Sequence, residues 1–268
     1  MIAKYYFHSL VTNKFLWFWG GFFSLMWAAL GAFVMDRSFL TPLTAMPITS
    51  AWYALIALIS FSSVSVTLAM SMAWSTNALI FSFKYTKLLR SRYLLDLLLA
   101  WIFVSLVLVV IGIVFTASMF YLSSKVNVFP TYLSFLKTFG IAVLVGVFFM
   151  LISVMLVLLV ISYGNVKIVQ FLSFIPMVLV FSLSYLMIYA SPPKLLMYLS
   201  PWNSGPSLIQ AAFANQQPIS SFVSSHPETL SWFTLLMSLV LWELVLFAID
   251  IYIFRHIKPQ DTEGMRQI

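Results

Sequence analysis

Six long apolar segments, separated by short polar stretches, make up most of this chain. Each segment is close to the ~20 residues that a helix needs to cross ~30 Å of hydrocarbon. The runs are continuous and lack the alternation of apolar and polar positions found in membrane β-strands, so the pattern predicts helices. The predicted spans are Phe15–Met35, Trp52–Phe81, Leu94–Tyr121, Phe139–Ser162, Ile168–Tyr189 and Leu230–Phe254. We therefore expect one all-α integral membrane domain over residues 1–268.

The composition agrees with a chain whose main solvent is lipid. Hydrophobic residues make up 62% of the chain and charged residues only 8%, whereas about 25% of a typical soluble domain is charged. A soluble fold could not cover its surface with so few charges. We therefore expect a multi-pass protein of the cell (plasma) membrane.

The fourteen lysines and arginines are divided unequally between the two sets of connections. Ten lie beside the termini or after the even-numbered spans, and four lie on the opposite side. Because cytoplasmic loops carry the excess of positive charge, both termini are predicted to be cytoplasmic. The charges are scattered between apolar segments, so the net charge of +7 does not indicate nucleic-acid binding.

Several kinds of chemistry are not supported by the sequence. No Gly-x-x-x-x-Gly-Lys-Ser/Thr phosphate loop is present, so the chain is not expected to bind ATP in that way. The chain has no cysteine, and His8, His226 and His256 all fall outside the predicted spans. We therefore predict that the chain is not an enzyme and has no catalytic residue, metal or cofactor of its own.

The largest concentration of charge lies between the second and third predicted spans. Residues Phe83–Arg92 hold four of the fourteen lysines and arginines. If this stretch is helical, its basic residues fall on one arc and apolar residues lie opposite. The pattern predicts a short amphipathic element that docks a cytoplasmic partner. Its candidate docking residues are Lys84, Lys87, Leu88, Arg90 and Arg92.

Two further segments have an amphipathic pattern. Residues 1–14 combine aromatic residues with two lysines, which predicts an interfacial helix along the cytoplasmic leaflet. The connection between the fifth and sixth spans is by far the longest, and it has apolar clusters between Leu195 and Phe213. These clusters predict short helices that lie at the outer leaflet or dip into it, with an ordinary ordered loop as the alternative.

Polar residues within the predicted spans mark a candidate substrate path. The stretch Ser60–Thr67 is rich in small hydroxyl residues, which favour either close helix packing or a polar lining. Glu243 is a functional candidate because an acid in lipid is energetically unfavourable; the alternatives are a protonated side chain or a hydrogen bond to a neighbouring helix. The candidate path residues are Ser62, Ser65, Thr67, Trp74, Asn77, Phe174, Met177, Phe181 and Glu243.

This arrangement resembles the ABC-2 type permease subunits of ATP-binding cassette exporters. That family has six spans, both termini inside, an N-terminal interfacial helix, a cytoplasmic coupling helix between spans two and three, and a re-entrant helix pair between spans five and six. Here Phe83–Arg92 looks like the coupling helix, and Leu195–Phe213 looks like the re-entrant pair, with Leu199-Ser200-Pro201-Trp202-Asn203 at its turn. The family's frequent Asn-Pro pair is absent, and Gln210 stands near the place of a frequent arginine.

The resemblance implies a function and partners. Two permease chains, identical or paralogous, would dimerise in the lipid bilayer, and two separate ABC ATPase subunits, which would bind ATP and Mg²⁺, would dock on the basic stretch. ATP binding would switch a cavity between inward and outward access and export a hydrophobic or amphipathic substrate such as a drug, lipid or peptide. The alternative is an ATPase-independent six-span solute-binding or channel-like protein, or a membrane scaffold.

Overall fold

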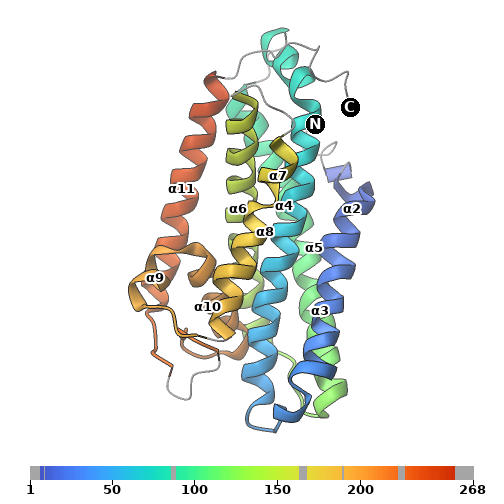
Figure 1. Ribbon diagram of the computed structural model, residues 1–268, viewed down its shortest axis with the longest axis vertical. Coiled ribbons are helices and arrows are strands. Elements are labelled where there is room, and N and C mark those ends of the chain that lie inside the picture. Colours follow the sequence, from blue (N-terminus) through green and yellow to red (C-terminus); the bar gives the residue numbers. More distant parts are fainter. Residues whose placement is uncertain are drawn as a thin grey trace.

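Five helical stretches in the described part of the chain are long and apolar enough to cross a membrane. The computed structural model describes residues 7–8, 10–85, 89–162, 168–188, 190–222 and 227–256, and no β-strand occurs among them. The prediction of an all-α membrane-embedded protein is therefore confirmed (Figure 1). The five stretches are Trp17–Met35, Ala45–Ala73, Ser91–Ser124, Tyr132–Ser162 and Trp232–His256.

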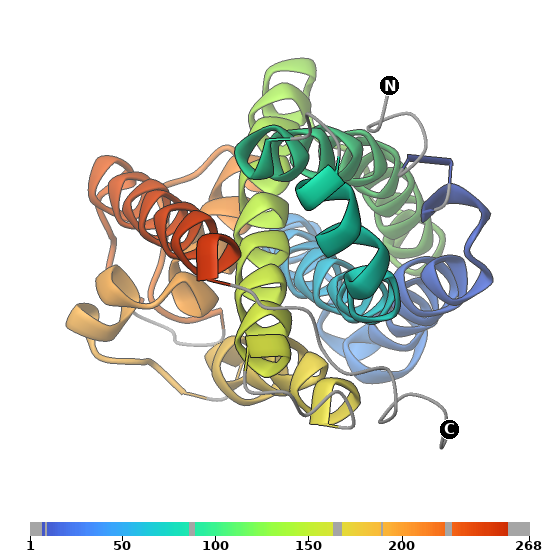
Figure 2. The same cartoon turned by 90° about the horizontal axis from the view of Figure 1, so that it is seen from above.

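The long helix α4 (Ala45–Tyr85) lies at the centre of the bundle. It packs against α5 (Arg90–Ser124), α6 (Tyr132–Ser162) and α10 (Pro201–Ala214), and 83% of its most apolar stretch is buried. Its 41 residues reach about 60 Å, twice the hydrocarbon thickness, so α4 extends beyond the membrane. Figure 2 shows α4 and α6 in the middle of the bundle, with α11 (Trp232–His256) at one edge.

The first predicted span is present, but it is not a regular α-helix. It follows α2 (Lys14–Leu16) and consists of the π-helix η1 (Trp17–Phe23), the α-helix α3 (Ser24–Leu30) and the π-helix η2 (Gly31–Met35). Glycines bring this segment close to α4. A β-carbon at Gly20 would overlap Val64 Cγ2, and one at Gly31 would lie 2.6 Å from the ring of Trp52. Any larger residue at these two positions would require the segment, or the side chain of α4 that it meets, to shift.

The fifth predicted span, residues 168–189, is a series of short helices in the structure. They are α7 (Val169–Ser173), α8 (Ile175–Leu179), the π-helix η5 (Val180–Ser184) and the 3₁₀-helix η6 (Tyr185–Ile188). Pro176 lies in the first turn of α8, where its missing N–H is harmless, whereas a continuous helix would require that N–H. Figure 1 shows these elements running from the end of the bundle where α6 ends toward α10.

The other predicted spans differ from the helices mainly at their ends. The predictions over residues 52–81, 94–121 and 139–162 fall inside the longer helices α4, α5 and α6, and residues 230–254 correspond to α11. Hydropathy follows the hydrocarbon, whereas backbone hydrogen bonding continues a helix beyond it. Of the predicted interfacial helix, residues 1–6 and 9 lie outside the described residues, and residues 10–12 are helical.

The two ends of the bundle carry different connections (Figure 1). The last turn of α4, the first turn of α5 and the last turn of α11 lie at one end, which we call the α4–α5 end. Helices α9 (Lys194–Leu199) and α10 lie toward the opposite end, which we call the α10 end. The basic connection and the buried helix α10 therefore lie toward opposite ends of the bundle.

Candidate functional site

Helix α10 has a polar face that is buried inside the protein. Asn203, Ser207 and Gln210 recur at intervals of about one helical turn, and Ser204 is adjacent to Asn203, so the four residues lie on one broad side of the helix. Each is at most 1% exposed, because α10 packs against α4, α6 and α11. We call these four residues the polar face of α10.

Local sequence determines where α10 begins and ends. Ser200 has extended backbone before the helix, and Pro201 occupies its first turn, where no N–H is needed. Asn215 ends the helix in the left-handed conformation, with φ of 54° and ψ of 45°. Asparagine is one of the few residues that adopts this conformation readily at a helix C-terminus. The helix is therefore held to a short length that fits between the long helices.

The proline inside α10 connects this helix to η5. Pro206 has no N–H, so the Trp202 carbonyl one turn earlier lacks its donor within the helix. The hydroxyl of Ser184 donates to that carbonyl. In addition, the side-chain amide of Asn203 donates to the Leu183 carbonyl at 3.0 Å. A side chain of η5 thus donates to a backbone carbonyl of α10, and a side chain of α10 donates to a backbone carbonyl of η5.

Two more residues of the polar face bond to distant parts of the chain. Ser207 Oγ donates to the Ile219 carbonyl at 2.8 Å, in the connection that follows α10. Gln210 Nε2 donates to Ser50 Oγ in α4 at 3.3 Å, between residues 160 positions apart. Ser50 Oγ in turn donates to the Pro47 carbonyl at 2.7 Å. The polar face therefore joins α10 to the start of α4 as well as to its own loop.

Some polar atoms in this region have no partner among the described residues. They are Ser204 Oγ, Asn203 Oδ1 and Gln210 Oε1 on α10, and the hydroxyl of Tyr53 on α4. The ring of Tyr53 packs against Phe213 of α10 with centroids 5.2 Å apart. A buried polar group without a partner costs about 1–3 kcal/mol, so this concentration indicates a place for water or a polar group of a ligand. We call the polar face together with Tyr53 the polar layer.

The predicted hydroxyl-rich stretch of α4 is buried among helices. Ser62 and Ser65 are 0% exposed and Thr67 is 7% exposed. Ser62 Oγ donates to the Ile59 carbonyl at 3.0 Å, and Thr67 Oγ1 contacts the Ser63 carbonyl at 3.5 Å, both within α4. These bonds fit close helix packing. The hydroxyl of Ser65 has no partner in the described part of the chain, so Ser65 is compatible both with close helix packing and with a polar lining.

The remaining predicted path residues do not form one cluster. Phe174, Met177 and Phe181 belong to the segment that contains α7, α8 and η5, and α7 and α8 pack against α4 and α6. Glu243 lies on α11, which packs mainly against α6, α10 and α5. The side chains of Trp74 and Asn77, on α4, lie outside the part of the structure that is described.

Glu243 is half-buried on its helix. Its Oε1 atom is buried and has no hydrogen-bond partner among the described residues. The predicted alternative of a hydrogen bond to a neighbouring helix is therefore not seen for this oxygen. Glu243 consequently remains a functional candidate, separate from the residues of α7, α8 and η5.

The basic stretch between α4 and α5 is not a single helix. Helix α4 continues through Tyr85, Leu89 has extended backbone with φ of −76° and ψ of 136°, and α5 begins at Arg90. The prediction of one amphipathic coupling helix over Phe83–Arg92 is therefore wrong. The physical reason is that the extended backbone of Leu89, directly before α5, interrupts a helix over these positions.

The predicted docking residues are consequently divided between two helix ends. Lys84 lies in the last turn of α4, and Arg90 and Arg92 lie in the first turn of α5. Lys87 and Leu88 lie outside the described residues. Arg92 is exposed, as the docking prediction requires.

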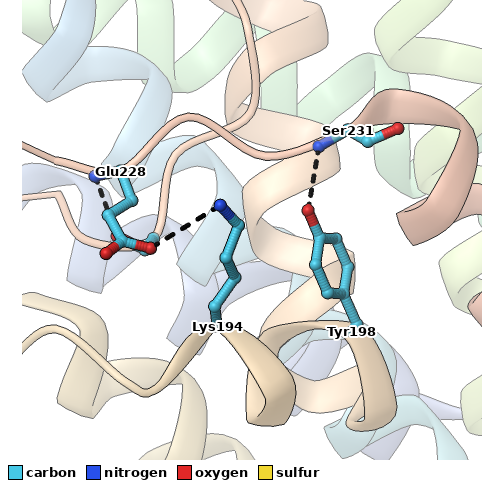
Figure 3. Close-up of polar contacts among 5 residues, drawn as sticks. Lys194, Tyr198, Glu228 and Ser231 are labelled. Atoms are coloured by element: carbon cyan, nitrogen blue, oxygen red, sulfur yellow. Dashed lines mark hydrogen bonds and ion pairs between the residues drawn. The ribbon is translucent and has the colours of Figure 1, made fainter.

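At the α10 end, α9 is joined to the segment before α11 (Figure 3). Lys194 Nζ lies 3.9 Å from Glu228 Oε2, and both side chains are more than half exposed. The backbone N–H of Ser231 donates to the hydroxyl of Tyr198 at 3.3 Å. We call these two contacts the α9 latch. They hold the short helix α9 beside the start of α11.

Sequence reasoning did not identify the polar layer. It placed Leu195–Phe213 in short helices at or within the outer leaflet, and it took the apolar clusters as the informative residues. The available signal was the recurrence of Asn203, Ser207 and Gln210 at helical spacing within an otherwise apolar helix. That spacing shows a polar face but not whether water or protein covers it.

The chain was compared with protein-family models and with curated proteins. No family model matches it, and no curated protein matches it.

Proposed function

We propose that this chain is the transmembrane permease subunit of an ABC-2 type ATP-binding cassette exporter. The observation that supports the proposal best is the pair α9–α10 (Lys194–Ala214), which is inserted before the last long helix. The second helix of the pair is buried almost throughout, in contact with α4, α6 and α11. A re-entrant pair at this place is part of the layout that the sequence resembles.

The chain would cross the membrane six times, with both termini in the cytoplasm. The five long helices supply five crossings, and the apolar series α7, α8, η5 and η6 would supply the sixth, although proline and π-turns interrupt it. Irregular backbone is tolerated within a membrane when other protein segments cover it. The exposed side chains of Lys14, Arg92 and Arg255 at the α4–α5 end agree with a cytoplasmic face there.

Energy from ATP would have to enter at the α4–α5 end. The chain has no phosphate loop of its own, so two separate ATPase subunits would bind ATP and Mg²⁺ and dock at this end. Because the basic residues sit on the ends of α4 and α5, a push there would act directly on two long helices. Helix α4 reaches the polar layer through Ser50 and Tyr53, so its movement would change the contacts of α10.

The polar layer would act as the outer part of the transport path. Its amide and hydroxyl groups hold α10 against α4 and η5 in this state, and the acceptors that have no partner among the described residues are available to water or to a donor on the substrate. A hydrophobic or amphipathic substrate, such as a drug, lipid or peptide, would be exported by a dimer of two permease chains. Glu243 on α11 is a further candidate contact for the polar part of such a substrate.

The first test is purification of the tagged full-length protein in a mild detergent, followed by mass spectrometry and an ATPase assay. We expect a nucleotide-binding subunit in stoichiometric amount together with ATPase activity. A lone protein without ATPase activity would contradict the proposal and would support an ATPase-independent solute-binding protein or scaffold.

A second test reverses charge at the docking residues. The double variant Lys87→Glu with Arg90→Glu should reduce association with the ATPase, because the partner surface would meet negative charge in place of positive charge. The matched control is Lys125→Glu with Lys137→Glu, which makes the same change of charge in the opposite set of connections. Equal ATPase recovery from both double variants, with normal membrane insertion, would exclude docking at the basic stretch.

A further inference from the structure

A cavity of about 240 Å³ lies between η1 and α3 on one side and α4 and α5 on the other. Along α4 it extends from Tyr53 to Phe61, which corresponds to about 12 Å. On α5 it reaches from Leu108 to Gly112. None of its lining residues belongs to α10 or to the candidate path residues, and Tyr53 is the residue that it shares with the polar layer.

Three of the polar side chains that line this cavity bond within the protein, whereas the hydroxyl of Tyr53 has no partner among the described residues. Trp17 Nε1 donates to the Val11 carbonyl at 2.6 Å, and the Ser60 hydroxyl donates to the Gly20 carbonyl. Ser24 Oγ lies 3.5 Å from the Trp19 carbonyl. The remaining surface is supplied by apolar groups such as Ile56, Leu108 and Val109. A ligand with several polar groups would leave them unpaired here, so the walls select hydrocarbon.

Two of the residues that line the cavity also face the hydrocarbon of the membrane. Phe22 and Ile111 both line it, and they are 62% and 37% exposed. Both lie well inside membrane-spanning stretches, where an exposed apolar side chain is in contact with lipid chains rather than water. The molecule that reaches the cavity therefore comes from the bilayer.

The volume limits what the cavity can hold. A dry cavity of about 150 Å³ is large enough for benzene, whereas pockets for drug-sized molecules start at roughly 300 Å³. A volume of about 240 Å³ that extends over two helical turns fits part of one alkyl chain. We propose that this cavity between η1, α3, α4 and α5 binds an acyl chain of a bilayer lipid, inserted from the side between Phe22 and Ile111.

Occupancy does not depend on the hydrophobic effect in this setting. The surrounding bilayer is as apolar as the cavity, so transfer from lipid to protein gains nothing by itself. An empty cavity, however, leaves its wall atoms without contacts on one side, and a chain that fills it restores those dispersion contacts. The site therefore favours a flexible alkyl chain that can take the shape of the cavity. This inference is independent of the proposed partnership with an ATPase.

Gly21 provides a direct way to close the cavity. A β-carbon at Gly21 would meet only Trp17 Cε3, at 3.7 Å, which is ordinary van der Waals contact. Because Gly21 lines the cavity, the side chain of Gly21→Ala or Gly21→Leu would occupy the space that the acyl chain uses. Gly140 in α6 gives the matched control, since a β-carbon there meets nothing within 4 Å and the residue is exposed.

The test uses the full-length protein in nanodiscs that contain phosphatidylcholine with a photoactivatable diazirine in the middle of one acyl chain. After irradiation, mass spectrometry locates the labelled peptides. We expect labels on the wall segments 53–61 and 108–112 in the wild type. Labelling there should decrease partly in Gly21→Ala and several-fold in Gly21→Leu, while Gly140→Ala and Gly140→Leu keep the wild-type pattern.

Three results would overturn the proposal. One is labelling in the wild type confined to outward-facing residues such as Phe103 and Val107, which are 57% and 42% exposed. Another is unchanged wall labelling in a Gly21→Leu variant whose melting temperature matches that of Gly140→Leu. The third is unchanged wall labelling in Gly21→Ala. This variant decides the question if Gly21→Leu does not fold, because its single added carbon fits without displacement of its neighbours.

Discussion

Helices α10 and α11 pack against each other, yet α10 buries polar side chains whereas α11 exposes apolar ones. In α10 the polar residues Asn203, Ser204 and Gln210 are at most 1% exposed. In α11 the apolar residues Leu241 and Leu244 are 55% and 60% exposed, and only 17% of the most apolar stretch of the helix is buried. In water both arrangements would be unfavourable.

The difference follows from the bilayer as solvent. Lipid offers no hydrogen bonds, so a polar side chain at membrane depth must find its partners within the protein. An apolar side chain loses little by facing lipid, so α11 needs only one stripe of contact with the bundle. That stripe consists of Leu235, Leu239, Leu246, Asp250 and Phe254. Asp250, the acidic residue in the stripe, is 0% exposed, and neither of its carboxyl oxygens has a hydrogen-bond partner among the described residues.

The largest predicted effect compares one substitution in the two helices. Phe213→Ala in α10 should lower the free energy of unfolding by roughly 3 kcal/mol, because it leaves a cavity against Tyr53. This loss is at the low end of the usual range for such a substitution, because the side chain would otherwise be in contact with lipid rather than water. Phe233→Ala in α11, where the side chain is 72% exposed, should change it by less than about 0.5 kcal/mol. Denaturation of both variants in the same detergent measures the difference; equal losses would contradict the buried position of α10.

A smaller effect distinguishes two serines of the polar face. Ser207→Ala should cost about 1–2 kcal/mol, because it removes the bond to the Ile219 carbonyl and leaves that carbonyl unpaired. Ser204→Ala removes a hydroxyl that has no partner among the described residues, so it should be neutral or slightly stabilising. The same unfolding assay compares the two. If Ser204→Ala proves the more costly, the hydroxyl of Ser204 has a partner, such as bound water.

The smallest expected effect concerns the α9 latch. Lys194→Met removes an exposed ion pair with a long N···O distance of 3.9 Å, so the free energy of unfolding should fall by no more than about 0.5 kcal/mol. That loss should disappear at high salt, since exposed charges are screened. Lys125→Met, at another exposed lysine, serves as the control. A loss that persists at high salt would show that α9 depends on Lys194 for packing as well as charge.

Much of the fold was predictable because it depends on local pattern. The long helices α5, α6 and α11 follow from continuous apolar runs, and such runs in lipid must be helical to satisfy the backbone. The short length of α10 follows from Pro201 at its start and Asn215 at its end. The break at Pro176 was also visible in the sequence, although hydropathy alone predicts one continuous span there.

The candidate site was less predictable because its contacts join distant parts of the chain. Ser62 and Thr67 were selected as polar residues in a span, but their hydroxyl groups are engaged within α4. Gln210 was noted only as standing in the place of a frequent arginine, yet it bonds to Ser50 across 160 positions. No periodic pattern records such a pairing.

The sequence by itself determined that this is a helical membrane protein, and it predicts that the basic residues are concentrated on one side. Those properties are sums over many residues, and each depends only on composition, hydropathy and spacing. Only the tertiary structure decided that the polar face of α10 is covered by α4 and η5, and that η1 and α3 leave a cavity beside α4. The physical reason is that burial and cavities are properties of how helices meet. Their positions are set by close contacts, such as Gly20 with Val64, between segments that the chain brings together only on folding.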